Sequence, residues 1–268
     1  MCKTAGASCP RASSLARLKA FETIYAALFG AAAGSFLNVV VWRVPRGESI
    51  AVPPSHCTNC ETRIKARDNV PVLSWALLRG RCRACGTAIS ARYPLIELGT
   101  ALLFAAIVLI RGLDWDLAWQ LPFAAMLVAV AAIDLDHHIV PNKILLPAAV
   151  WGVVSAALIR LSDLPELLAW GAGAFLFLLV AALVYPAGMG MGDVKLAGVM
   201  GLYLGSSVLP ALLAGFLSGS VVGVVMLARH GAAARKMGVP FAPFLALGAV
   251  VGLLAGPELV DLYRNSFL

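Results

Sequence analysis

The sequence has little charge. Only 13% of its 268 residues are Asp, Glu, Lys or Arg, whereas 60% are hydrophobic, and the mean hydropathy is +0.87. A soluble globular protein carries about twice this share of charged residues, so the composition excludes that class. Apolar runs long enough to cross roughly 30 Å of hydrocarbon recur along the chain, which predicts an all-α polytopic membrane protein.

Two further features are absent. The chain has no internal repeat of fixed period, and its basic N-terminal tail lacks a short apolar segment with a small-residue cleavage site, so we expect no cleavable signal peptide. A net charge of +7 would suit a nucleic-acid partner. The basic residues lie mainly between the first two apolar runs, however, and this is the cytoplasmic excess of a membrane protein. We therefore expect contact with membrane lipid and no nucleic acid.

The apolar runs predict about eight transmembrane helices. The expected spans are residues 21–44, 95–111, 117–133, 144–160, 166–186, 194–209, 211–228 and 241–257. When the basic loop after the first span is placed in the cytoplasm, alternation puts the connections at 134–143, 186–195 and 229–240 on the same side.

Four of the six cysteines form two CxxC pairs in the loop after the first span. Two such pairs can present four thiolates to one tetrahedral ion, and they leave no ligand position open for water. We therefore expect a structural Zn²⁺ held by Cys57, Cys60, Cys82 and Cys85. A reducing cytoplasm favours this over disulfides. A redox role is the weaker alternative, because no βαβ pattern surrounds the pairs.

The first two spans carry polar residues. Ser35 and Asn38 lie one helical turn apart, where small and amide residues most often serve helix packing, with a polar ligand pocket as the minority interpretation. Glu97 is expected in the first turn of the second span, where a carboxylate complements the helix dipole. The depth of Glu97 in the membrane also makes it a candidate for binding a cationic group.

Acidic residues occur at the ends of two later spans. Asp134 and Asp136 follow an apolar run, and Pro141 prevents that helix from continuing. Asp193 opens another span directly after glycines at 188, 190 and 192, whose missing Cβ atoms let another chain approach the backbone. We interpret the space beside Asp193 as a place for a second peptide.

Two carboxylates held close together can hydrolyse an amide bond. Both cannot ionise at once, so one keeps a proton while the other stays charged and activates water. A solvated residue at a helix end would explain Asp134 or Asp193 alone, but their combination favours chemistry. His137 and His138 are expected near lipid headgroups, and Lys195 is expected to extend toward the interface.

At these residues the sequence resembles the type IV prepilin peptidases, which are integral-membrane aspartyl proteases of the GxGD type. The resemblance covers almost the whole chain, and one departure is Ala242, where the family usually has glycine. The motifs that carry it are Gly34-Ser35-Phe36-Leu37-Asn38, both CxxC pairs with Asp68-Asn69-Val70-Pro71 between them, Arg92-Tyr93-Pro94-Leu95-Ile96-Glu97, Asp134 with Pro141-Asn142, Gly190-Met191-Gly192-Asp193, and Pro240-Phe241-Ala242-Pro243-Phe244.

The resemblance implies that Asp134 and Asp193 are the catalytic pair, with Asp136 as the substitute for Asp134. Gly190, Gly192, Asp136 and Lys195 are expected to support the site or bind the substrate. The resemblance further implies a bifunctional enzyme of the bacterial inner membrane. Such an enzyme removes the leader from pilin or pseudopilin precursors at the cytoplasmic face, just before their apolar helix.

The same enzyme then methylates the new amino terminus with S-adenosylmethionine. This half rests on the resemblance alone, and Ser35, Asn38 and Glu97 are the candidate residues for it.

The expected organisation is a tail and first transmembrane helix (1–44), a cytoplasmic zinc-binding loop domain (45–93) and a seven-helix membrane aspartyl protease core (94–268).

Three alternatives remain open from the sequence. A peptidase without methyl transfer is the nearest of them. A cation-coupled transporter would use a broken helix at 188–193 to bind an ion at Asp193, but it predicts an acidic residue near the bilayer midplane, whereas both acidic motifs lie at span ends. A zinc-stabilised membrane scaffold without catalysis leaves the aspartates unexplained.

Overall fold

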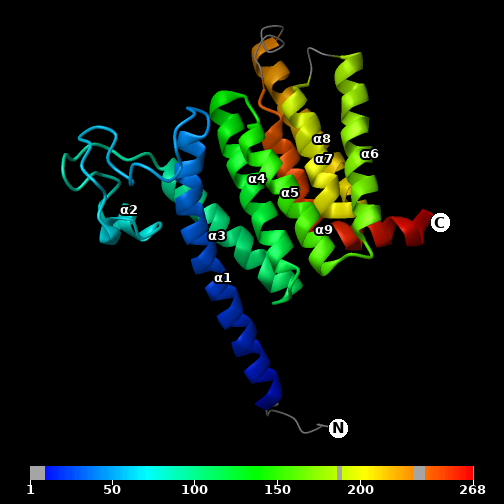
Figure 1. Ribbon diagram of the computed structural model, residues 1–268, viewed down its shortest axis with the longest axis horizontal. Coiled ribbons are helices and arrows are strands. Elements are labelled where there is room, and N and C mark those ends of the chain that lie inside the picture. Colours follow the sequence, from blue (N-terminus) through cyan, green and yellow to red (C-terminus); the bar gives the residue numbers. More distant parts are fainter. Residues whose placement is uncertain (1–9, 186–188, 232–238, 268) are drawn as a thin grey trace. The chain divides into compact units, whose positions relative to one another are not determined.

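The computed structural model describes residues 10–185, 189–231 and 239–267, and within these ranges its regular structure is helical apart from two isolated bridges (Figure 1). Two 3-10 turns lie at Ala66–Asp68 and Gly205–Ser207. The α-helices are α1 (Pro10–Arg43), α2 (Leu73–Leu77), α3 (Arg92–Arg111), α4 (Leu117–His137), α5 (Asn142–Ile159), α6 (Leu164–Val184), α7 (Met191–Leu204), α8 (Val208–His230) and α9 (Ala242–Phe267).

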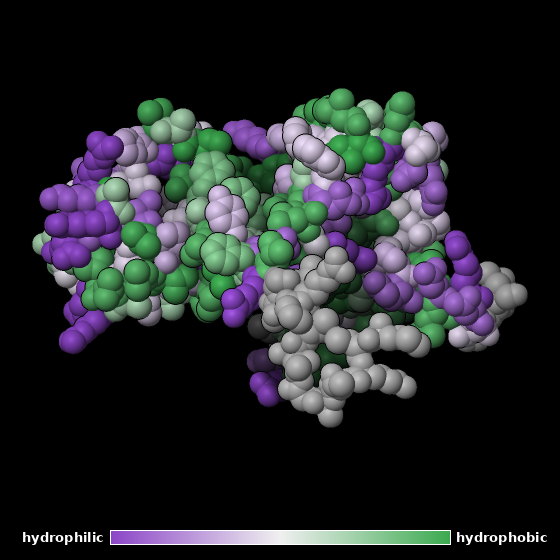
Figure 2. Space-filling view, turned by 90° about the horizontal axis from the view of Figure 1, so that it is seen from below, coloured by the Kyte–Doolittle hydropathy of each residue, from purple (hydrophilic) through white to green (hydrophobic). Residues whose placement is uncertain are grey.

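Seven segments of the described chain are long and apolar enough to cross a membrane. One of them, Met191–His230, contains both α7 and α8, so the expected eight spans correspond to α1 and α3 to α9. Many large apolar side chains are exposed, with Leu158 and Val184 at 79% and 80%, and Figure 2 shows such hydrophobic residues among hydrophilic ones on one face. Such a surface is stable against lipid and not against water, so the chain is a multi-pass membrane protein.

Several expected boundaries were wrong. The first helix begins at Pro10 instead of residue 21, since proline is well tolerated at a helix start. The last helix continues to Phe267 past Pro257, where we expected its end, because proline removes only one backbone donor from the helix. The boundary expected near residue 210 lies at Gly205 instead, whose positive φ of 56° ends α7.

The contacts divide the chain into two compact units. The first comprises Met1–Phe36 and His56–Leu117, and the second comprises Leu37–Ser55 and Ala118–Leu268. In the first unit α1 packs closely on α3. A Cβ atom at Gly34 would lie 2.7 Å from the Glu97 Cα, and one at Gly30 would lie 2.8 Å from the Ala101 Cα. Glycine at both positions therefore permits the backbones to approach, as small residues do in membrane helix pairs.

Tyr203 on α7 is the centre of the core in the second unit. Its ring stacks on Phe123 of α4 at a centroid distance of 4.5 Å, and its hydroxyl donates to the Ala148 carbonyl of α5 at 2.7 Å. The indole of Trp119 donates in turn to the Tyr203 carbonyl at 3.1 Å. These contacts hold α4, α5 and α7 together, while α6 packs along α7 and α8 along α9.

Candidate active site and cysteine cluster

The structure brings Asp134 and Asp193 together at one end of the second unit. Asp134 lies near the end of α4 and is 5% exposed, whereas Asp193 lies in the first turn of α7 and is 8% exposed. The two side chains are close enough for their charges to repel one another. Asp136, the expected substitute, is exposed. The buried pair is therefore Asp134 with Asp193.

The turn between α4 and α5 places Asp134. The helix ends at His137, and His138 has a φ of 52° while its N–H donates to the Asp134 carbonyl at 2.9 Å. Pro141 then precedes α5, so the chain turns where the sequence analysis expected. This tight reversal holds Asp134 at the end of the helices instead of within their length.

The glycines before α7 have different environments. Gly190 is an exposed, extended residue, and a Cβ atom placed on it would lie 3.5 Å from the Asp193 Oδ2. A Cβ atom at Gly192, in contrast, would lie 2.7 Å from the Cβ of Val140. The expectation that these glycines make room for a second peptide was therefore wrong at Gly192, where the chain itself fills the space. It remains a prediction at Gly190, and Gly188 lies outside the described residues.

Ala242, the first residue of α9, completes this end of the unit. Its backbone N–H donates to the Asp134 Oδ2 at 3.1 Å, and its side chain is fully buried. Sequence reasoning missed this contact. The signal for it was the helix start between Pro240 and Pro243, in a connection expected on the same side as Asp134.

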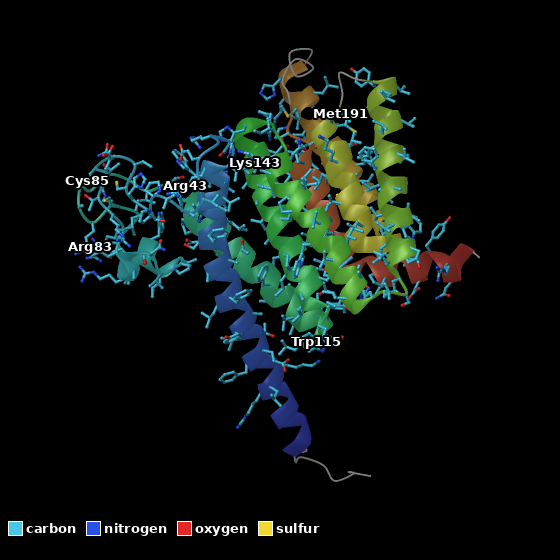
Figure 3. The ribbon with its side chains drawn as sticks, in the orientation of Figure 1. Arg43, Arg83, Cys85, Trp115, Lys143 and Met191 are labelled. Carbon is cyan, nitrogen blue, oxygen red and sulfur yellow. The ribbon has the colours of Figure 1, made fainter. Side chains whose placement is uncertain are left out.

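Basic side chains lie in the first turns of α5 and α7. Lys195 is exposed, and its Nζ donates to the Asn142 Oδ1 at 3.1 Å, so it connects α7 to the start of α5. Figure 3 shows Lys143 in the first turn of α5 and Met191 in the first turn of α7, the turn that also carries Asp193. His137 and His138 are exposed, as expected of interfacial residues.

The four cysteines of the first unit form one cluster. All four Sγ atoms lie within 4.8 Å of one another, and Cys57 Sγ is 3.8 Å from Cys85 Sγ. A tetrahedral Zn²⁺ with bonds of about 2.3 Å needs sulfurs about 3.8 Å apart. The donor set and its spacing therefore fit the expected zinc ion.

The two CxxC pairs have the same backbone geometry. The Cys57 N–H donates to the Thr62 carbonyl at 3.0 Å, and the Cys82 N–H donates to the Thr87 carbonyl at 2.8 Å. The Thr87 hydroxyl lies 3.3 Å from the Cys85 Sγ, and this contact is the main reason that the pKa of Cys85 falls to about 6. Such a thiol is ready to bind a metal as the thiolate.

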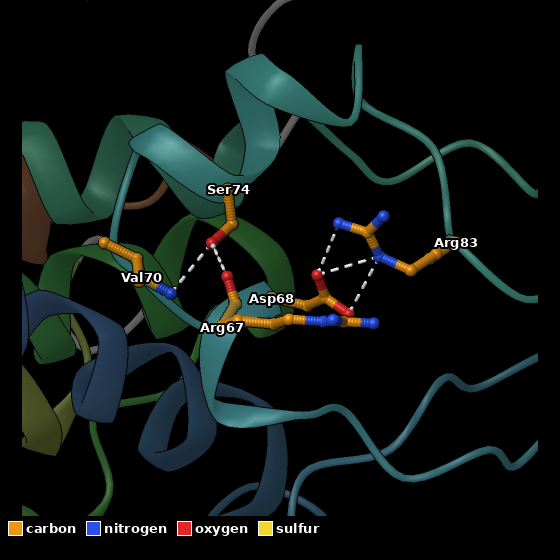
Figure 4. A network of polar contacts seen from close by, with 5 residues as sticks. All are labelled: Arg67, Asp68, Val70, Ser74 and Arg83. Atoms are coloured by element: carbon orange, nitrogen blue, oxygen red, sulfur yellow. Dashed lines mark hydrogen bonds and ion pairs between the residues drawn. The ribbon is translucent and has the colours of Figure 1, made fainter.

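An ion pair connects the second cysteine pair to the rest of the loop (Figure 4). Arg83, which lies between Cys82 and Cys85, contacts Asp68 through Nε at 2.9 Å and through a terminal nitrogen at 2.7 Å. The guanidinium lowers the pKa of Asp68. The Ser74 hydroxyl accepts the Val70 N–H at 2.8 Å and donates to the Arg67 carbonyl at 3.3 Å.

Glu97 on α3 makes a further contact with the loop, through the backbone N–H of Val72. Because α3 begins at Arg92, Glu97 lies in the second turn, and the expected pairing with the helix dipole in the first turn was wrong. Its buried Oε2 accepts the N–H of Val72 at 2.6 Å, and Val72 has a φ of 60°. Ser35 follows Gly34, which packs on Glu97, and Asn38 lies one turn later on α1; the role of these three residues in methyl transfer stays a prediction.

These observations define the class of protein: a helical multi-pass membrane protein with two buried carboxylates at one end and a loop that carries four cysteines. Residues 28–110 match the bacterial peptidase A24 N-terminal domain, and residues 121–228 match the type IV leader peptidase family. The chain belongs to the type IV leader peptidase family, and it is an enzyme of the aspartic peptidase type.

Curated relatives match over most of both chains. The prepilin leader peptidase/N-methyltransferase of Aeromonas hydrophila is 34% identical, covering 90% of this chain and 93% of the relative. The protein of the same name from Stutzerimonas stutzeri is 33% identical over 89% and 92%, and that from Bacillus subtilis is 33% identical over 88% and 95%. No solved structure matches the chain.

Proposed function

We propose that this protein is a membrane aspartyl endopeptidase that removes the leader from prepilin-like precursors at the cytoplasmic face of the bacterial inner membrane. In a second reaction it methylates the new amino terminus with S-adenosylmethionine. The observation that carries the peptidase half is the burial of Asp134 and Asp193 beside one another. The names of the relatives support both halves.

The proposed hydrolysis needs both carboxylates. One ionised aspartate removes a proton from water, whose oxygen attacks the scissile carbonyl, while the other aspartate donates its proton to the carbonyl oxygen. The tetrahedral intermediate then collapses, the C–N bond breaks, and the leaving nitrogen takes the proton that came from water. The second aspartate recovers its proton from the intermediate, so the pair returns to its starting state without a covalent intermediate.

The precursor would reach the pair beside Gly190. This residue is extended and exposed, and it lies directly against the Asp193 carboxylate. A helical peptide bond is shielded from attack, so the precursor must unwind here. Its apolar segment stays among the helices, which suits a cut placed just before such a segment.

The charge distribution supports a cytoplasmic site. The end of the second unit that carries the aspartates also holds Lys143, Lys195 and Arg229, whereas the other end holds Asp163 in the connection after Arg160 and Glu166 in the first turn of α6. Cytoplasmic connections carry the excess of basic residues. Asp193 lies at the start of α7, near a span end, and this position disfavours the transporter, which needs its ion site near the midplane.

The cysteine loop is proposed as a zinc-stabilised domain of residues 45–93. Zn²⁺ bound by Cys57, Cys60, Cys82 and Cys85 would cross-link the loop and leave no ligand position for water. S-adenosylmethionine would supply the methyl group. Ser35, Asn38 and Glu97 stay candidates for that reaction, although the Glu97 carboxylate already accepts the Val72 N–H.

The test incubates purified protein in detergent with a pilin-like precursor and S-adenosylmethionine and reads product masses. Wild type should lose the leader and gain one methyl group, while Asp134→Asn and Asp193→Asn should leave the precursor whole. Substantial cleavage by either variant refutes the aspartate pair. Cleavage without methylation refutes the transferase half alone.

A further inference from the structure

The short helix α2 of the cysteine loop has an apolar side that the described chain leaves uncovered. Leu73 and Leu77 lie one helical turn apart and are 55% and 74% exposed. The rest of the helix is fixed to the loop, since Ser74 is buried and the indole of Trp75 donates to the Ile89 carbonyl at 3.0 Å. The two leucines are therefore exposed on a helix that is held in place.

A hydrogen bond sets the depth of this helix in the membrane. The N–H of Val72, directly before α2, donates to the Glu97 Oε2 at 2.6 Å. Helix α3 begins at Arg92 and, with 20 residues, is about 30 Å long, which is the thickness of the hydrocarbon layer. Glu97 lies about 7 Å along α3 from this start. The start of α2 is therefore held at the depth of interfacial helices, which lie about 5–10 Å into the boundary between headgroups and acyl chains.

Lipid also reaches α3 at this depth. Leu95 and Leu98, which flank Glu97 in the sequence, are 65% and 44% exposed. In a chain that spans a membrane, exposed apolar side chains at this level face lipid. The apolar side of α2 and the exposed leucines of α3 therefore belong to the same layer.

Basic residues follow the apolar side directly. Arg79 and Arg81 come just after the end of α2 and are exposed, and neither forms an ion pair within the described part of the chain. Arg83 differs from them, because Asp68 neutralises it at 2.7 Å. Apolar residues beside unneutralised arginines are typical of segments that lie on an anionic leaflet, and each such charge near the surface favours anionic lipid about fivefold.

We propose that α2 and the two arginines after it form a membrane-surface anchor for an anionic phospholipid leaflet. Leu73 and Leu77 enter the interface, while Arg79 and Arg81 bind lipid phosphates. The anchor fixes the cysteine loop to the leaflet at which α3 begins. It goes beyond the proposed peptidase, since none of its contacts involves the aspartate pair.

Photo-crosslinking identifies what covers the leucines. The full chain with Leu77→p-benzoylphenylalanine is placed in nanodiscs of phosphatidylcholine with a minor share of phosphatidylglycerol, and adducts are read by mass after irradiation, with and without a pilin-like precursor. We expect phospholipid adducts in which phosphatidylglycerol exceeds its share of the lipid by about fivefold. The control position is Thr58, an exposed residue of the first cysteine pair, which should give no lipid adduct.

Three results at these positions overturn the anchor. A precursor adduct in place of lipid at Leu77 would make this side of α2 a substrate-docking site. Equal lipid adducts at Thr58 would show that the loop touches lipid without a defined anchor, and no adduct at Leu77 would show that water covers the leucines. Each result is separate from failure of the proposed function, because lipid adducts are read without cleavage of a precursor.

A charge variant tests the arginines. In Arg79→Gln/Arg81→Gln the benzoylphenylalanine at Leu77 should still react with lipid, but phosphatidylglycerol should fall to its share of the mixture. The matched control is Arg63→Gln/Lys65→Gln, which removes the same charge from exposed residues before α2 and should keep the enrichment. Enrichment that survives in Arg79→Gln/Arg81→Gln, or an equal loss in both variants, overturns the binding of phosphates by these arginines.

Discussion

The first turn of α7 lies directly against the turn between α4 and α5, where a Cβ atom at Gly192 would come within 2.7 Å of the Cβ of Val140. These two segments carry Asp193 and Asp134. The distance between the carboxylates therefore depends on glycine at 192, and the reason is packing within the chain.

Replacement of Gly192 tests this dependence. Gly192→Ala must push α7 away from Val140, and a misplacement approaching 1 Å costs about 100-fold in rate, so kcat for leader cleavage should fall by that order. The double variant Gly192→Ala/Val140→Ala should recover at least part of kcat. Gly223→Ala on α8 is the control, since no atom of the described chain lies within 4 Å of a Cβ there. Absence of any recovery in the double variant would contradict the packing explanation.

Substitutions of Glu97 test whether this residue anchors the 45–93 loop or takes part in methyl transfer. Glu97→Ala leaves the Val72 N–H without its acceptor, whereas Glu97→Gln keeps an oxygen there. We expect limited proteolysis to cut the 45–93 loop faster in Glu97→Ala and at the wild-type rate in Glu97→Gln. A loss of methylation in Glu97→Gln with an intact loop would instead place Glu97 in the transferase site.

Zinc retention should depend on the Thr87 hydroxyl. Because this group helps to lower the pKa of Cys85 to about 6, Thr87→Val raises that pKa toward its ordinary value, and protons then compete with the metal at higher pH. As the pH falls, zinc should leave Thr87→Val before it leaves wild type, as followed with a colorimetric chelator between pH 8 and 4. Thr58→Val is the control in the other cysteine pair. Identical release curves for Thr87→Val and wild type would show that the hydroxyl is irrelevant to the metal.

Helix packing in the second unit can be tested at Gly201. A Cβ atom there would lie 2.8 Å from the Gly171 Cα of α6, so Gly201→Ala should destabilise the fold by about 1–3 kcal/mol. Thermal unfolding in detergent measures the effect. Gly173→Ala, on an open face of α6, should unfold at or slightly above the wild-type temperature. Equal unfolding temperatures for the two variants would show that α6 and α7 can separate at little cost.

Composition and local spacing were sufficient for much of this structure. Hydropathy predicted the membrane helices because each must bury its own backbone bonds, and the CxxC spacing predicted the cysteine cluster because each pair is a local turn. Boundaries were less accurate, as at the last helix, which continues past the expected end at residue 257. A proline removes a single backbone donor and does not by itself end a helix.

Contacts between distant segments were not predictable in this way. The sequence gives no sign that Val140 fills the space at Gly192, or that Val72 approaches Glu97 from a loop 25 residues away. The order of the helices in space sets both contacts. Glycine beside an aspartate was therefore interpreted as room for a substrate, when at residue 192 it is room for the chain itself.

The contact between Asp134 and Ala242 also orders events during biosynthesis. The two residues are 108 positions apart, and both aspartates precede Ala242 in the chain. A nascent chain that stops after α8 therefore contains both carboxylates but lacks the Ala242 amide, and the contact at Asp134 Oδ2 is completed only when α9 takes its place.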